Sequence, residues 1–82
     1  MNLELYTDVA LSVDLPQSGL RRGDIVKLVE NLTARDGTHG YAVEVLNALG
    51  ETIDVHTIPA SAVEALRDDE VLCVRSRIAA VA

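Results

Sequence analysis

Aromatic side chains are almost absent from this chain of 82 residues, which contains no Phe, no Trp and only Tyr6 and Tyr41. Small barrels and related modules recognise proline-rich peptides, methylated lysine and single-stranded RNA on exposed aromatic rings. Two tyrosines offer few aromatic rings for these modes of recognition. Apolar residues still make up 49% of the sequence, so the core must be built from Val, Leu, Ile and Ala.

The residues that build reactive centres are equally scarce. Cys73 is the single cysteine, so an intrachain disulfide is excluded, and its aliphatic neighbours predict a small buried side chain. His39 and His56 are the only histidines, and neither has a metal-site spacing to Cys, Asp or Glu. No phosphate-binding glycine loop and no Ser-His-Asp or Cys-His arrangement can be assembled. We therefore expect no enzymatic activity, no cofactor and no metal.

Basic residues are few: seven Lys and Arg stand against 13 Asp and Glu, a net charge of -6 with His neutral. Such a charge repels phosphate backbones and anionic membranes at long range. Arg21 and Arg22 form the only adjacent basic pair, which is too small to carry nucleic-acid binding by itself. A basic protein is the complementary partner, although an acidic surface also serves solubility alone.

The chain also shows no basic start followed by an apolar core, as a secretory signal would, and no apolar stretch long enough to cross a bilayer. Together with the lone cysteine, these features predict a cytoplasmic protein without a membrane partner. A chain of this length buries only roughly 60–65% of the surface that its unfolded form exposes. A second copy, or a partner that covers apolar surface, would therefore stabilise it appreciably.

The most informative segment is residues 18–30, where two glycines lead into a run rich in β-branched residues. Gly23 can adopt positive φ and Asp24 can bond neighbouring backbone amides, so the segment predicts a turn that feeds a strand over residues 25–32. The apolar residues also fall at helical spacing, and a helix that begins after Asp24 is the competing interpretation. We favour the strand because a glycine-rich turn, residues 34–40, and a second alternating run, residues 41–45, complete a hairpin.

An alternating first strand is predicted over residues 5–13. The residues that it offers to the core are Tyr6, Val9, Leu11 and Val13. The loop that follows contains Pro16 and Gly19, and Leu20 is expected to plug the barrel from this loop.

The most regular alternation covers residues 51–58. It predicts a strand with Ile53 and Val55 on the core face and with Asp54 and His56 on the other face. Asp54 and His56 could then form a polar patch, and catalysis or metal binding there would need a third polar group. We interpret His56 as an ordinary exposed strand histidine.

Pro59 ends this strand, and residues 60–67 predict one or two helical turns. A last strand is predicted over residues 71–78. Five short strands, with a helical turn before the last, describe a mainly β fold, a small SH3-like barrel. We expect one domain over residues 1–82, in which residues 68–82 form a C-terminal strand and tail.

Two surfaces are predicted as interaction sites. The first is an acidic cluster of Glu64, Asp68, Asp69 and Glu70, which would dock a basic partner or simply form a solvated face. The second is the uncovered edge of the last strand, which could add a strand from a second copy. Its self-association residues are Val71, Cys73, Arg75 and Arg77.

Several segments, in order along the chain, resemble a known family. They are Leu5-x-x-Asp8-Val9-Ala10-Leu11, Asp14-Leu15-Pro16, Gly19-Leu20-x-x-Gly23-Asp24-x-Val26, Tyr41-x-Val43-Glu44-Val45 and Gly50-x-Thr52 through Ile58-Pro59-Ala60-Ser61. Over residues 5–66 the chain is similar to small bacterial proteins catalogued as domain of unknown function number forty-nine twenty-six. The resemblance implies a bacterial SH3-like barrel without an established activity. Because such proteins often sit beside toxin-like or nuclease-like genes, it also allows an antitoxin or immunity role.

Taken together, these features predict a non-catalytic bacterial module for protein–protein interaction. Its partner would be another protein, with the product of an adjacent gene as the first candidate, and self-association would accompany it. The alternative is an RNA- or ribosome-associated small barrel, which the acidic charge and the scarcity of aromatic residues disfavour.

Overall fold

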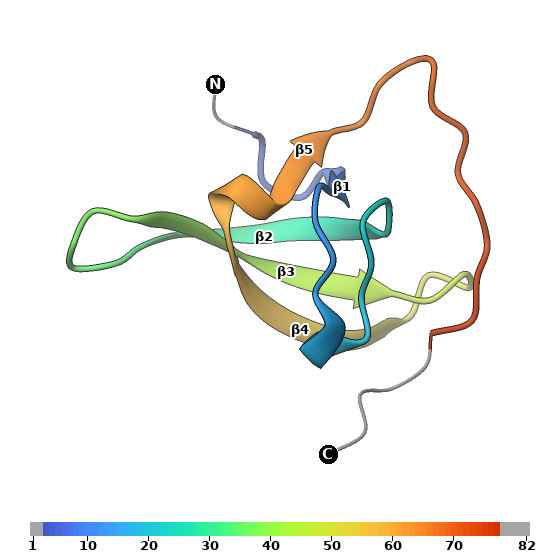
Figure 1. The fold of residues 1–82 in the computed structure, drawn as a ribbon, viewed down its shortest axis with the longest axis horizontal. Helices are drawn as coiled ribbons and strands as arrows, with labels where there is room; N and C mark the ends of the chain where they lie inside the picture. Colours follow the sequence, from blue (N-terminus) through green and yellow to red (C-terminus); the bar gives the residue numbers. More distant parts are fainter. Residues whose placement is uncertain (1–2, 78–82) are drawn as a thin grey trace.

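Five antiparallel strands form one curled sheet in the computed structural model, which describes residues 3–77 (Figure 1). The strands are β1 (Asp8–Leu11), β2 (Ile25–Thr33), β3 (His39–Leu46), β4 (Thr52–Pro59) and β5 (Val63–Ala65). Their order in the sheet is β4-β3-β2-β1-β5, so β4 and β5 are the edges. Two 3-10 turns, η1 (Pro16–Ser18) and η2 (Ala60–Ala62), precede β2 and β5. The fold is the mainly β, SH3-like arrangement that the sequence predicts.

The segment from Ile25 onward is a strand, and the competing helical interpretation is wrong. Val26 lies opposite Val9 of β1 on one side and Val45 of β3 on the other, so β2 is the centre of the sheet. Its β-branched side chains suit this doubly paired position. Gly23 has a φ of 91° in the turn that feeds it, as predicted.

The core is aliphatic except for Tyr41, which is 7% exposed and belongs to it. Its most deeply buried members, each at most 2% exposed, are Val9, Leu11, Val26, Leu28 and Val43. Leu20 is 3% exposed and plugs the barrel, as predicted.

The prediction for Tyr6 and Val13 is wrong, because these side chains are 72% and 42% exposed. The first strand is shorter than the expected range 5–13. The chain turns at Tyr6, where φ is 64°, and the strand is confined to Asp8–Leu11, in which Val9, Ala10 and Leu11 are all buried.

The core face of β4 is the opposite of the predicted one. Ile53 and Val55 are 47% and 56% exposed, whereas Asp54 and His56 are partly buried and Ile58 is buried. The reason is the register with β3, which sets Ile58 beside Tyr41. Residues paired across two strands point to the same side of the sheet, so this pairing turns Asp54 and His56 inward.

The pairing of β3 with β4 also requires a glycine. A Cβ added to Gly40 would lie 2.7 Å from the backbone oxygen of Ile58. That distance is well inside van der Waals contact. The oxygen belongs to the backbone and a Cβ is fixed by its bond to Cα, so neither can turn aside. Gly40 therefore belongs to β3 and to its close approach to β4, and the turn predicted to include it is confined to residues 34–38.

The end of the chain departs furthest from the sequence prediction. The segment predicted as one or two helical turns contains η2 and then β5, whose Val63 pairs with Leu11 at the free side of β1. Pairing there provides partners for the backbone groups of β1 that a helix would leave unpaired. The strand predicted over residues 71–78 is wrong for residues 71–77, which form no strand, and residue 78 lies outside the described part. We call residues 68–77 the strap; it leaves β5 and returns past the barrel toward η1 and β4 (Figure 1).

Candidate interaction site at the C-terminal strap

The strap begins with a tight turn and then runs without regular structure. In the turn, the Glu70 N–H donates to the Arg67 carbonyl at 3.2 Å, and the Arg67 N–H donates to Glu70 Oε1 at 2.6 Å. Over residues 71–77 the described backbone makes no backbone–backbone hydrogen bond. Side chains therefore hold this part of the strap on the barrel.

Arg75 is the first anchor. Its Nε donates to Asp24 Oδ1 at 2.8 Å, and its Nη2 donates both to Asp24 Oδ2 and, at 3.1 Å, to the carbonyl of Gly19. A guanidinium that spans both oxygens of a carboxylate makes the strongest and most directional ion pair available to side chains. The Arg21 N–H donates to Asp24 Oδ2 at 2.7 Å and orients that carboxylate, as the sequence predicts for an aspartate in a turn.

Arg77 is the second anchor. Its Nη2 donates to the carbonyl of Ser18 at 2.6 Å and to Asp54 Oδ2 at 2.9 Å. The same Asp54 oxygen lies 3.0 Å from His56 Nε2, so the two residues that share a face in the sequence do meet. Nothing in the sequence indicates the third polar group beside them, because Arg77 is separated from Asp54 by 23 residues.

Both carboxylates are stabilised in their charged form. Partial burial by itself raises the pKa of Asp24, but hydrogen bonds from Arg75 and from the Arg21 amide, with the charges of both arginines, outweigh it and hold the pKa below 3.8. The hydrogen bond from Arg77 is the main cause that lowers the pKa of Asp54 below 3.8. The hydrogen bond to Asp24 in turn raises the pKa of Arg75.

These pKa shifts predict that acid weakens the attachment of the strap. Because each folded-state pKa lies below the ordinary value of 3.8, the two pairs contribute stability that is complete above this value and is lost as the pH falls through the folded pKa. We expect the melting temperature to fall below about pH 4. The double variant Asp24→Asn/Asp54→Asn should show a shallower fall, measured by circular dichroism in buffers from about pH 2 to 7. Parallel pH profiles for the two proteins would contradict this prediction.

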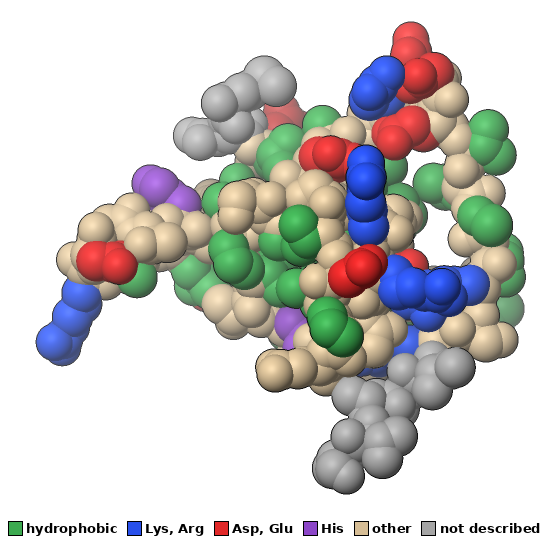
Figure 2. Space-filling model, in the orientation of Figure 1, with side chains coloured by type: hydrophobic (Ala, Val, Ile, Leu, Met, Phe, Trp, Pro, Cys, Tyr) green, Lys and Arg blue, Asp and Glu red, His purple; other side chains and the backbone are tan. Residues whose placement is uncertain are grey.

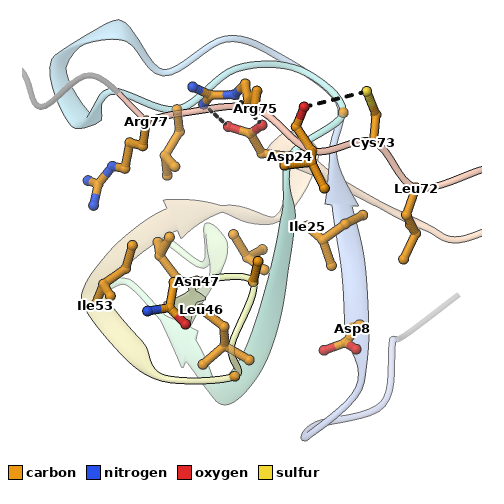
Figure 3. Close-up of a pocket in the computed structure, with 17 residues that line it drawn as sticks. Asp8, Asp24, Ile25, Leu46, Asn47, Ile53, Leu72, Cys73, Arg75 and Arg77 are labelled. Carbon is orange, nitrogen blue, oxygen red and sulfur yellow. Dashed lines mark hydrogen bonds and ion pairs between the residues drawn. The ribbon is translucent and has the colours of Figure 1, made fainter.

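A hollow of about 570 Å³ lies between the strap and the open end of the barrel (Figure 3). Its apolar wall on the barrel includes Leu20, Ile25, Leu46 and Ile53, and Leu72 of the strap faces them across the opening. The Asp24–Arg75 pair closes one end. The strap thus lies over an apolar surface of the barrel and leaves the hollow between them open.

The acidic residues predicted as a docking surface are accessible. Glu64 is exposed on β5, and the other three, Asp68, Asp69 and Glu70, are exposed in the turn that starts the strap. Asp69 pairs with Arg67 at 3.0 Å, so one basic side chain lies among the acidic ones (Figure 2). Docking of a basic partner at this turn stays a prediction.

The residues predicted for self-association have two different environments. Val71 is 92% exposed and Cys73 is also exposed, so the prediction of a buried cysteine is wrong. Arg75 and Arg77 are turned onto their own barrel and are each about a quarter exposed. Because residues 71–77 form no strand, the predicted strand edge for a second copy is not present there.

Comparison with known families identifies the barrel. The model of a family described as Domain of unknown function (DUF4926) matches residues 5–65. The chain belongs to the DUF4926 family. This confirms the resemblance found in the sequence. The DUF4926 match contains all five strands with Asp24 and Asp54, whereas Arg75 and Arg77 lie beyond it.

No curated protein and no solved structure matches the chain significantly. Within residues 3–77, no group of three His, Cys, Asp or Glu side chains is arranged to hold a metal ion. None of the helical turns in that range has the length and apolar character needed to span a membrane.

Proposed function

We propose that this DUF4926 protein is a non-catalytic bacterial interaction module that binds another protein through exposed aliphatic side chains of its strap. The observation that carries the proposal is the exposure of three large aliphatic side chains in a row of four residues. Val71 is 92% exposed, Leu72 is 67% exposed and Val74 is 86% exposed. Single exposed apolar residues are ordinary, but a contiguous group of them marks a surface that a partner covers.

Charge supports a basic partner. The acidic turn at Asp68, Asp69 and Glu70 lies directly before the exposed aliphatic residues, and the whole chain carries a net charge of -6. Acidic groups at the rim of an apolar contact steer an oppositely charged protein and raise its rate of association. An antitoxin or immunity role in the cytoplasm would make this partner the product of an adjacent gene.

The test is direct binding between the full-length chain and the purified product of the adjacent gene. Binding is measured by titration calorimetry and by size-exclusion chromatography with light scattering. We expect a complex with the unaltered chain and at least about tenfold weaker binding by Val71→Ser/Leu72→Ser/Val74→Ser. Val55→Ser is the matched control, because Val55 is 56% exposed on β4 and does not line the hollow beneath the strap. An unchanged monomer mass in the mixture would contradict the proposal, and a steep salt-dependent affinity for RNA would favour the alternative class.

A further inference from the structure

We infer that the DUF4926 barrel carries a binding site for an extended protein segment with two arginines separated by one residue, and that the strap is its intramolecular occupant. The inference rests on the proposed function, since a partner protein must supply the competing segment. The site consists of the Asp24 and Asp54 carboxylates and the backbone carbonyls of Ser18 and Gly19.

The four acceptors are oriented by the barrel itself. Asp24 accepts from the Arg21 N–H at 2.7 Å, and Asp54 Oδ1 accepts from the Val55 N–H at 2.9 Å. The two carbonyls belong to the η1 turn, in which the Gly19 N–H donates to the Pro16 carbonyl at 3.1 Å. These contacts all lie within the family match, so none of them depends on a residue of the strap. A preorganised set of acceptors binds a ligand without first being ordered.

The chemistry of the site selects arginine. Asp24 uses both carboxylate oxygens on Arg75, which requires a planar fork with at least two N–H donors. A lysine ammonium offers only a compact charge and cannot make this bidentate contact. In an extended chain, alternate side chains project to the same side, and Arg75 and Arg77 both reach the barrel while the intervening Ser76 is exposed.

The strap is an imperfect occupant. Its residues 71–77 add no described backbone–backbone hydrogen bond to the sheet, so the arginine side chains supply the polar contacts. Among the described residues, the Arg77 Nε is buried without a hydrogen-bond partner. A buried donor that has lost its hydrogen bonds to water and has gained no acceptor in the protein weakens the binding of the strap to the barrel. A partner segment that satisfies all of its donors can therefore displace the strap.

The charge balance favours the same class of ligand. The chain has a net charge of -6, and both arginines that occupy the site come from the strap rather than from the matched barrel. A segment with an Arg-x-Arg motif brings two positive charges to two carboxylates whose charged forms are already favoured. Displacement would also free the apolar part of the strap and open the hollow beneath it.

The test uses a labelled synthetic peptide with the sequence of residues 70–77 and full-length proteins, measured by fluorescence anisotropy under reducing conditions. In the variant Arg75→Ala/Arg77→Ala the site is vacated, so it should bind the peptide at least about tenfold more tightly than the unaltered chain does. Adding Asp54→Asn or Asp24→Asn should remove that gain. Adding Asp36→Asn, which alters a carboxylate of the remote β2–β3 turn, should leave it unchanged.

A second peptide, with lysine in place of both arginines, should bind the vacated variant at least about fivefold more weakly than the arginine peptide. Equal binding of the two peptides, or no binding by a vacated variant whose circular dichroism and thermal transition remain native, would overturn the inference. If the full-length chain forms a dimer and Asp24→Asn dissociates that dimer, a second copy of the chain occupies the site. This result would also overturn the inference. Failure of the proposed function would be seen in a different measurement, as the absence of a complex with the product of the adjacent gene. The two results are independent, because peptide binding does not depend on Val71, Leu72 or Val74 of the protein.

Discussion

Leu28→Ala should lower the free energy of unfolding by about 2–5 kcal/mol. Leu28 is 0% exposed and lies in the central strand, opposite Val43, which is also fully buried. Removing three carbons there leaves a cavity that the rigid sheet cannot close. Because small domains are stable by only about 5–15 kcal/mol, the variant should lose a large fraction of the stability of the domain.

The measurement is urea unfolding followed by circular dichroism, with thermal melting in parallel. In a domain of this size each kcal/mol corresponds to a shift of about 4–8 °C in the melting temperature. Leu49→Ala is the control, because the same substitution at a side chain that is 85% exposed should change the stability by less than about 0.5 kcal/mol. Similar losses for the two variants would show that the sheet does not close around Leu28.

Asp24→Asn/Asp54→Asn should release the strap without unfolding the barrel. The two carboxylates receive Arg75 and Arg77, and the strap makes no described backbone–backbone hydrogen bond over residues 71–77. Local opening of a segment held by so few contacts is governed by those contacts alone. We expect trypsin to cleave after Arg75 and Arg77 about tenfold faster than in the unaltered chain, as followed by mass spectrometry over time.

Asp36→Asn is again the matched control, because Asp36 accepts the Thr38 N–H at 2.9 Å in the β2–β3 turn and does not contact the strap. Its cleavage rate at Arg75 and Arg77 should equal that of the unaltered chain. If the double variant is also cleaved at the unaltered rate, other contacts hold the strap in place. If the barrel itself is digested, circular dichroism will show the loss of the sheet.

Local chemistry explains why much of the barrel could be predicted. The run of β-branched residues after Gly23 and the alternation of residues 41–45 appear as β2 and β3. The strand and turn propensities of neighbouring residues are enough to specify such a hairpin, because a glycine turn and two alternating runs lie within one continuous stretch. Leu20 was likewise predictable as a core residue, since an apolar side chain in a short polar loop has only the interior to enter.

The candidate site could be predicted only in pieces. The sequence marks Asp24 as a turn residue and Asp54 as a neighbour of His56. It also predicts Arg75 and Arg77 within one extended segment, residues 71–78. Nothing in their spacing indicates that these residues meet, because Asp24 and Arg75 are 51 positions apart. Pairing over that distance depends on the path of the strap, which no local periodicity specifies.

The order of polar and apolar residues, with its glycine turns, determined by itself that this is an aliphatic, mainly β domain of the DUF4926 kind. Only the tertiary structure decided which face of β4 turns inward, because a two-residue period fits either face equally and the pairing of Ile58 with Tyr41 selects one. It also decided that residues 68–77 form a strap rather than a strand. The free side of β1 is occupied by β5, and two arginines then find their acceptors on the barrel.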